Sequence, residues 1–214
     1  MRMRKKKNGA ARLEECGQLL VKKPEALKGI WKETFGNENP VHIEIGCGKG
    51  GFITRLAKEN PDISYVAIEK LIDVLVLAAE KAKKEGLENV RFILGDASLL
   101  ESMFAEGEIE RIYINFCDPW HKKRHEKRRL TYRTYLELYK KLLKNNGWIY
   151  FKTDNKKLFE YSLNSFCENG FMLKNITLDL HNSEIKGNIM TEYEKLFSEK
   201  GNPIYRAEAS CLAK

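Results

Sequence analysis

The sequence lacks the marks of a secreted, metal-binding or membrane protein. Its five cysteines, an odd number scattered over 214 residues, include no C-x-x-C pair, which excludes a disulfide framework and a zinc site of that type. The basic first seven residues precede no apolar segment, and no run approaches the ~18 apolar residues of a membrane span. The P-loop pattern G-x-x-x-x-G-K-[ST] is absent, which argues against nucleotide hydrolysis. We expect a cytoplasmic protein with reduced thiols and no membrane segment.

Positive charge is in excess. The chain contains 38 Lys and Arg against 30 Asp and Glu, for a formal net charge of +8. This balance favours a polyanionic partner, although a lysine-rich surface on any soluble protein would give the same value. Hydrophobic residues make up 43% of the chain, which is enough for a sizeable core.

The sequence predicts two parts. Residues 1–39 are expected to form a basic N-terminal arm, mobile over residues 1–15, and a short helical lead-in over Leu19–Phe35 that Pro24 interrupts. Residues 40–214 are expected to form one α/β domain, because no linker or internal repeat divides them. The arm can act as a basic tether for nucleic acid or be a frayed terminus.

From Pro40 onward, strand-like and helix-like segments alternate. Strands are expected at Val41–Ile45, Ser64–Glu69, Val90–Asp96, Glu110–Phe116, Trp148–Asp154, Phe171–Leu180 and Ile204–Leu212. Helices are expected at Gly51–Asn60, Leu71–Gly86, Leu130–Gly147 and Lys157–Gly170. This alternation predicts a seven-stranded, mostly parallel sheet with helices on both faces.

Acidic residues stand at the ends of the first five strands. Ligands of open α/β sheets bind beyond the carboxyl ends of the strands, so these positions are the first to inspect. An acid there can also cap the next helix, and one or two such acids would mean little. Five acids point to a site, and they are Glu44, Glu69, Asp96, Asp118 and Asp154.

A glycine-rich segment, EIGCGKGG, joins the first strand to the first helix. Gly46, Gly48 and Gly51 satisfy G-x-G-x-x-G, and Glu69 falls where an acid would hold ribose hydroxyls. The pattern alone fits NAD, FAD or S-adenosylmethionine (SAM). A tight turn that needs glycines only for its backbone would look the same.

Two acids favour SAM over a dinucleotide. Glu44 lies two residues before Gly46, where a carboxylate attracts the cationic amino-acid end of SAM and would repel a pyrophosphate. Asp96 is placed to accept a hydrogen bond from an adenine amino group. These residues resemble the Rossmann-like, SAM-dependent methyltransferase fold. The resemblance implies a cofactor site made of Glu44, Gly46, Gly48, Gly50, Glu69 and Asp96.

The fourth strand leads into the segment NFCDPWHKKRHEKRR, which places Asp118 at the start of a basic cluster. Amino-directed methyltransferases have a D/N-P-P-Y/F element at this point, and Asp118-Pro119-Trp120 is one proline shorter. Trp120 can stack on a base or anchor the loop. His121 and His125 have i,i+4 spacing but no third ligand nearby, so no metal is expected.

Four segments together give a more specific resemblance. GCGKG, NFCDPWHKKRHEKRR, FKTDN and TEYE, in this order and spacing, resemble the bacterial tRNA (guanine-N7)-methyltransferase family over nearly the whole chain from Pro40. The resemblance implies methyl transfer from SAM to N7 of a variable-loop guanine in tRNA. It places Asp118 at both the catalytic position and a SAM-contact position. The implied substrate contacts are Lys122, Asp154, Thr191, Glu192, Tyr193 and Glu194, and the implied RNA contacts within residues 124–129 include Arg124, Lys127, Arg128 and Arg129.

The chemistry of this reaction suggests a role for the carboxylate. Guanine N7 has a lone pair and no proton, so no general base is needed. Asp118 would orient the guanine edge and stabilise the positive charge that develops on the ring. Asp154, Glu192 or Glu194 can share that task, and the sequence does not rank them. Thr191 and Glu194 also form a capping-box pattern, which would start a helix facing the substrate.

Three other functions remain possible at the level of sequence. A methyltransferase for a small molecule or another base atom would act without tRNA. A non-catalytic RNA-binding module would bind tRNA without a tight SAM site, which the set of Glu44, Glu69, Asp96 and Asp118 argues against. An NAD-dependent oxidoreductase would bind NAD, which Glu44 argues against. Both a monomer and a homodimer are compatible with the sequence.

Overall fold

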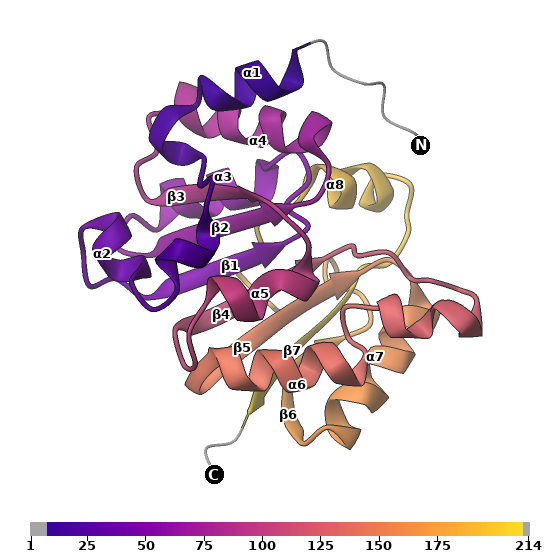
Figure 1. The fold of residues 1–214 in the computed structure, drawn as a ribbon. Helices are drawn as coiled ribbons and strands as arrows, with labels where there is room; N and C mark the ends of the chain where they lie inside the picture. The colour runs from indigo at the N-terminus through magenta and orange to yellow at the C-terminus, as the bar shows by residue number, and fades with distance from the viewer. Residues whose placement is uncertain (1–7, 212–214) are drawn as a thin grey trace. The chain divides into compact units, whose positions relative to one another are not determined.

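The computed structural model describes residues 8–211, and the chain forms two compact units, Met1–Phe104 (unit 1) and Ala105–Lys214 (unit 2). The seven strands follow the order β3-β2-β1-β4-β5-β7-β6 (Figure 1). The strands are β1 Val41–Ile45, β2 Ser64–Glu69, β3 Val90–Leu94, β4 Ile109–Asn115, β5 Leu143–Thr153, β6 Phe171–Thr177 and β7 Tyr205–Cys211. This confirms the predicted seven-stranded, mostly parallel sheet.

Helices connect the strands. The α-helices are α1 Gly9–Glu14, α2 Trp31–Phe35, α3 Gly51–Glu59, α4 Ile72–Lys84, α5 Leu100–Met103, α6 Arg133–Leu142, α7 Lys156–Glu168 and α8 Glu192–Ser198. The 3₁₀ turns are η1 Gly17–Leu19, η2 Pro24–Leu27, η3 Ala97–Leu99 and η4 Lys123–Arg128.

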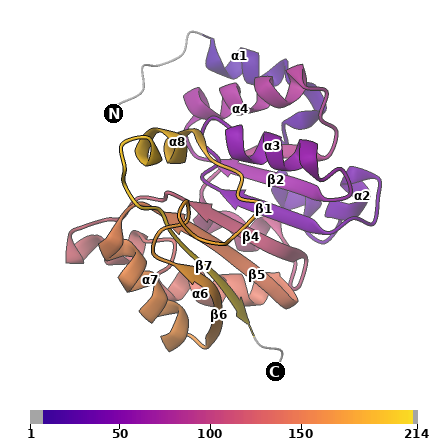
Figure 2. The ribbon, with the colours of Figure 1, turned by 180° about the vertical axis from the view of Figure 1, so that it is seen from behind.

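Unit 1 contains three parallel strands, with β1 next to β2 and β2 next to β3. Their side chains are almost all buried, as expected for parallel strands with helices on both faces. Figure 2 shows α3 and α4 on one face of these strands, and Figure 1 shows α2 and α5 on the other. Because the strands are parallel, their carboxyl ends share one edge, where Glu69 of β2 is in register with Leu94 of β3.

The start of the described chain is a packed helix, which corrects the expectation of a mobile arm for residues 9–14. Leu13 is buried, and α1 packs on α4. Arg12 donates from Nε and Nη2 to the two carboxylate oxygens of Glu80, at 2.8 and 2.7 Å. The sequence suggested a loose terminus because the segment is short and charged, but Leu13 supplies an apolar contact that orders it. Residues 1–7 lie outside the described part of the chain.

The expected lead-in helix over Leu19–Phe35 is instead a series of short elements. Pro24 begins η2, a position where its missing N–H costs nothing. Trp31 is fully buried at the start of α2, stacks on Phe104 and donates from its indole nitrogen to the carbonyl oxygen of Met103 at 2.9 Å. This aromatic anchor fixes the segment within unit 1.

Unit 2 combines two parallel strands, β4 and β5, with the antiparallel strands β7 and β6. Figure 1 shows α6 and α7 covering one face of these strands. The core on this side is aromatic, because Phe151 of β5 packs against Phe159 and Phe166 of α7. The parallel pairing brings the carboxyl ends of β4 and β5 to the same edge, with Asn115 in register with Lys152.

Several element boundaries differ from the sequence prediction, most clearly those between α6 and β5 and at the end of β6. The helix expected to run to Gly147 ends at Leu142, and the Asn-Asn-Gly segment lies inside β5 rather than stopping the helix. Pairing with β4 skips from Leu143 to Trp148, so the residues between them form an irregular bulge, with Asn146 at a φ of 63°. Strand β6 ends at Thr177 instead of Leu180, after a similar register shift.

Candidate active site

The glycine loop between β1 and α3 has the backbone that its sequence predicts. Gly46 and Gly48 have φ values of +79° and +56°, which strongly favour glycine. Gly50 has a second constraint, since a Cβ there would lie 2.5 Å from the Cβ of Ala78 on α4. Its glycine therefore lets α3 and α4 approach closely, while Gly46 and Gly48 leave open space beside the loop.

Several N–H groups of the loop are used inside unit 1. Those of Gly46 and Cys47 donate to the carbonyl oxygen of Ile68, at 2.8 and 3.1 Å. The N–H of Gly48 donates to the carboxylate of Glu69 at 3.2 Å. A dinucleotide site offers such N–H groups to the pyrophosphate. Their internal use makes this loop a poor diphosphate cradle.

The three acids of unit 1 have different surroundings. Glu44, the next-to-last residue of the buried β1, is 1% exposed. Glu69 is half-buried, and its second oxygen accepts the N–H of Leu71 at 3.0 Å, so the carboxylate is fixed at the end of β2. Asp96 accepts the N–H of Ser98 at 2.9 Å, and this backbone hydrogen bond holds the pKa of Asp96 below its usual value. Asp96 is therefore a carboxylate at neutral pH.

Three exposed leucines that were not predicted as site residues accompany these acids. Leu71, Leu94 and Leu99 are 52%, 45% and 51% exposed. Leu71 follows Glu69 by two residues, Leu94 is the register partner of Glu69, and Leu99 lies in the turn that Asp96 caps. Exposed leucines beside fixed carboxylates form a surface on which a flat heterocycle can pack. The signal available in the sequence was their spacing, since each leucine lies within three residues of Glu69 or Asp96.

In unit 2, Asp118 lies in a strained loop after β4. Phe116 and Trp120 have φ values of 52° and 43°, and bulky residues rarely adopt this left-handed conformation. Asp118, between them, is exposed. Desolvation of the sulfur and the negative charge of Asp118 raise the pKa of Cys117 to about 12, so this thiol is neutral and not a nucleophile at pH 7.

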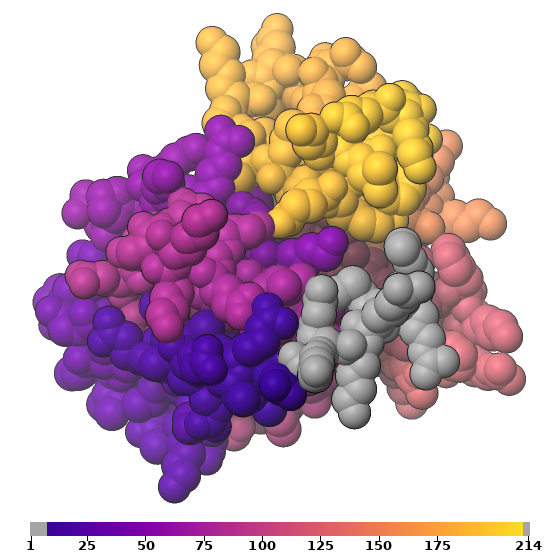
Figure 3. All heavy atoms as spheres, turned by 90° about the horizontal axis from the view of Figure 1, so that it is seen from above, coloured from indigo at the N-terminus to yellow at the C-terminus, as the bar shows by residue number. Residues whose placement is uncertain are grey.

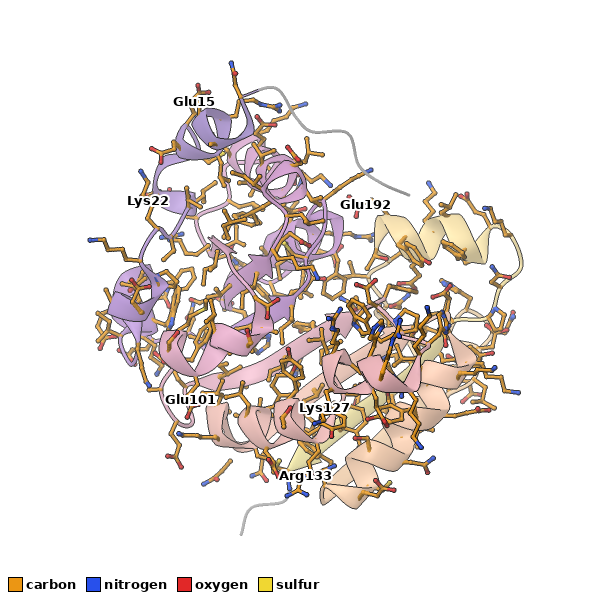
Figure 4. All side chains as sticks on the ribbon, turned by 45° about the vertical axis from the view of Figure 1, so that its right-hand side comes forward. Glu15, Lys22, Glu101, Lys127, Arg133 and Glu192 are labelled. Carbon is orange, nitrogen blue, oxygen red and sulfur yellow. The ribbon has the colours of Figure 1, made fainter. Side chains whose placement is uncertain are left out.

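The basic cluster divides into exposed and engaged side chains. Lys122, Arg124, Lys127 and Arg128 are exposed on or next to η4, and Figure 4 shows Lys127 in a part of unit 2 that is dense in side-chain nitrogen atoms. Arg128 lies over the ring of Trp120, which also contacts His125.

Arg129 is different from its neighbours. It donates from Nε to the carbonyl oxygen of Pro119 at 3.1 Å and from Nη2 to that of Trp120 at 3.2 Å, and it stacks on Tyr161. Its side chain is 15% exposed. Arg129 thus holds the loop that carries Asp118, which does not fit the expected direct contact with RNA.

Asp154 follows β5 and contacts α8 through Tyr193. It is half-buried and accepts a hydrogen bond from the hydroxyl of Tyr193. Desolvation, followed by the charge and hydrogen bond of Asp154, raises the pKa of Tyr193. The Tyr193 ring also lies 5.1 Å from that of Phe116 and stacks on Phe197 at 4.2 Å. The ends of β4 and β5 and the first turn of α8 therefore come together through Tyr193.

The TEYE segment forms the capping box that its sequence predicts. The Thr191 hydroxyl accepts the N–H of Glu194 at 2.8 Å, and the Glu194 carboxylate accepts the N–H of Thr191 at 3.4 Å. Glu192 is exposed, and Figure 4 labels it at the start of α8. Glu194 is fully buried. Its burial does not fit the expected direct contact with substrate, and we interpret it as a supporting residue.

Two other kinds of feature are absent from the described part of the chain. Between residues 8 and 211, no helix is long and apolar enough to cross a membrane. Within the same residues, no three His, Cys, Asp or Glu side chains are grouped so that they could hold a metal ion.

Comparison with known proteins identifies the family. The family model described as "Putative methyltransferase" matches residues 38–207. The tRNA (guanine-N(7)-)-methyltransferase of Geobacillus sp. (strain WCH70) is 55% identical, over 97% of this chain and 94% of the relative. The enzyme of the same name from Streptococcus thermophilus (strain CNRZ 1066) is 52% identical, over 98% of both chains.

Solved structures agree on the fold. An antibiotic-related methyltransferase aligns with a TM-score of 0.63 at 21% identity, over 85% of this chain and 92% of that one. A SAM-dependent methyltransferase from Aquifex aeolicus aligns with a TM-score of 0.58 at 13% identity, over 97% of this chain and all of that one. The fold is thus that of SAM-dependent methyltransferases, and the sequence relatives show that the chain belongs to the tRNA (guanine-N(7)-)-methyltransferase family.

Proposed function

We propose that this protein transfers a methyl group from SAM to N7 of a guanine in the variable loop of tRNA. The observation that carries the proposal is the exposed carboxylate of Asp118, which a strained loop presents directly before the exposed basic side chains of η4. A carboxylate suits a base that becomes positively charged, and a basic surface suits the phosphates around it.

The residues of unit 1 fit SAM. Glu44, at the end of the buried β1, suits the cationic amino group, and the open space beside Gly46 and Gly48 leaves room for the methionine part. The fixed carboxylate of Glu69 suits the ribose hydroxyls, and the ionised Asp96 can accept from the adenine amino group. The exposed leucines give the adenine ring an apolar surface. When bound, SAM supplies an electrophilic methyl group.

The residues of unit 2 orient the guanine. N7 carries a lone pair and no proton, so none of them needs to remove one. Asp118 accepts hydrogen bonds from the guanine edge and stabilises the charge that the ring gains. Asp154 is held by Tyr193 and can share this task, while the exposed Glu192 and Thr191 border the same turn. Lys122, Arg124, Lys127 and Arg128 bind phosphates, which position the tRNA without reading its sequence.

We extend the proposal to the organisation of the protein. The family match begins at residue 38, which supports a methyltransferase domain over residues 40–214 preceded by the segment 1–39. Its tRNA substrate places the reaction in the cytoplasm, and the proposal holds for a monomer or a homodimer.

Methyl transfer to tRNA that lacks the modification tests the proposal. The protein is incubated with labelled SAM and this tRNA, and the product is cleaved at 7-methylguanosine to map the label. We expect label at one variable-loop guanine and none with Asp118→Ala. Label at another position, or label on small molecules without tRNA, would overturn the assigned substrate. Full activity of Asp118→Ala would move the centre of the site to Asp154.

A further inference from the structure

We propose that Lys152 is a positioning residue that holds the substrate-facing turn of α8 at the end of β5. Lys152 lies in β5, two residues before Asp154, and is 4% exposed. The inference rests on the proposed function, because it assigns to a buried lysine the placement of a turn that contacts tRNA.

The Lys152 ammonium binds three acceptors in the segment before and within α8. Nζ donates to Glu194 Oε2 at 2.7 Å, to the carbonyl oxygen of Ile189 at 2.9 Å and to Asn188 Oδ1 at 3.0 Å. An ammonium has three N–H donors, so these contacts engage all of them. One side chain of the sheet therefore binds, through charge-assisted hydrogen bonds, a segment about forty residues further along the chain.

Glu194 completes the cluster from the side of the helix. Its Oε1 accepts a hydrogen bond from Nδ2 of Asn188 at 2.6 Å and lies 3.2 Å from Nε2 of His181. Its Oε2 accepts a hydrogen bond from the N–H of Thr191. The carboxylate is fully buried. A buried charge that loses its partner is strongly unfavourable, so Lys152 and Glu194 require each other.

The segment that this cluster holds has little structure of its own. Residues 181–191 contain neither helix nor strand, and α8 is only seven residues long. Figure 2 shows this segment and α8 beyond the ends of the unit 2 strands, and Figure 3 shows α8, in yellow, at the surface. A short surface helix gains little stability from its own hydrogen bonds, so tertiary contacts decide where it lies.

The position of the cluster links it to the chemistry. Tyr193, next to Glu194, hydrogen-bonds Asp154, and Asp154 follows Lys152 on β5. Tyr193 also packs against Phe116, two residues before Asp118. Without the contacts of Lys152, the first turn of α8 could move. Thr191 and Tyr193 would move with it, and Asp154 would lose its hydrogen bond from Tyr193. Lys152 acts on the reaction through these residues and does not touch the substrate itself.

The test compares Lys152→Met with the double variant Lys152→Met/Glu194→Gln. For Lys152→Met we expect a loss of at least 30-fold in kcat/KM for tRNA, with the Kd for SAM changed less than twofold. The double variant removes both buried charges and should recover the Tm of the wild type. It should not recover kcat/KM, because the contacts to Asn188 and Ile189 stay broken. Recovery of both would show a purely structural lysine and overturn the proposal.

Two further variants keep the test decisive if Lys152→Met does not fold. Asn188→Ala removes one acceptor of Lys152 and one donor to Glu194 at a half-buried position. It should lower kcat about fivefold with only a small fall in Tm, because the Lys152–Glu194 pair stays in place. Activity within twofold of the wild type would contradict the proposal. Lys156→Met is the matched control, since this exposed lysine of α7 pairs only loosely with Glu160, at 3.9 Å, and should change nothing. Wild-type protein without tRNA methylation would refute the proposed function instead.

Discussion

At the scale of single residues, the loop around Asp118 concentrates the unusual features of unit 2. It contains two aromatic residues in the left-handed region and a neutral, desolvated thiol. Arg129 donates two hydrogen bonds to carbonyl oxygens of the loop and so holds it in place. Backbone strain of this kind persists only where surrounding contacts enforce it. The loop therefore presents one carboxylate in a fixed place, which is what orientation of a base requires.

Replacing Asp118 by Asn removes the charge and keeps the shape. We expect kcat/KM for tRNA to fall by about 100-fold or more, the cost typical of losing one preorganised electrostatic contact in an active site. Single-turnover methylation with labelled SAM measures this loss. Asp62→Asn, a matched change at an exposed acid of unit 1, should leave the rate unaltered. Wild-type activity of Asp118→Asn would show that the negative charge has no role in the reaction.

The thiol beside Asp118 gives a pH-dependent prediction. The pKa of Cys117 is raised to about 12 from an ordinary 9.0, so the folded thiol stays protonated where an unfolded one ionises. Stability linked to this group is therefore lost as the pH rises above about 9. At pH 8.5 we expect iodoacetamide to alkylate exposed Cys167 much faster than Cys117, as followed by mass spectrometry. In urea the two thiols should be alkylated at equal rates. Equal alkylation rates in the native protein would contradict a desolvated environment for Cys117.

At the scale of elements, α1 shows how a short terminal segment becomes ordered. A helix of six residues is unstable alone, so its packing on α4 through Leu13 must hold it. Leu13→Ala should lower the free energy of unfolding by about 2–4 kcal/mol, the usual cost of truncating a buried leucine. Urea denaturation measures this difference. Gln18→Ala, at an exposed position, should change it by less than about 0.5 kcal/mol. If the Leu13→Ala protein were as stable as the wild type, Leu13 would not hold α1 in place, and the expectation of a mobile arm would stand.

The elements also show what can be read from sequence. The order of strands and helices and the strand-end acids follow from local patterns, since period, glycines and caps are short-range signals. The end of α6 does not follow from a local pattern, because the Asn-Asn-Gly segment is a bulge that depends on the pairing of β5 with β4. The burial of Glu194 depends on Lys152, more than forty residues earlier in the chain, and no local pattern encodes that contact. A lysine among apolar strand residues was the available signal.

At the scale of the whole molecule, the net charge of +8 predicts that tRNA affinity falls steeply with salt. Each phosphate contact contributes about 0.7–0.9 to the slope of log K against log salt concentration. Charge reversal of both Lys122 and Arg124, to Glu, should weaken binding and lower that slope by at least about 1. Filter binding at several salt concentrations measures both quantities.

Two controls separate a local binding surface from a general effect of charge. Lys84→Glu makes the same kind of change at an exposed lysine of α4 and should alter the slope much less, because only charges next to phosphates release counterions. Arg129→Ala should leave the slope nearly constant and lower the Tm, since its guanidinium is engaged with the Asp118 loop. An unchanged slope for the Lys122 and Arg124 reversals would remove the basic cluster from the tRNA interface. The positive charge would then act only as a diffuse field around the protein.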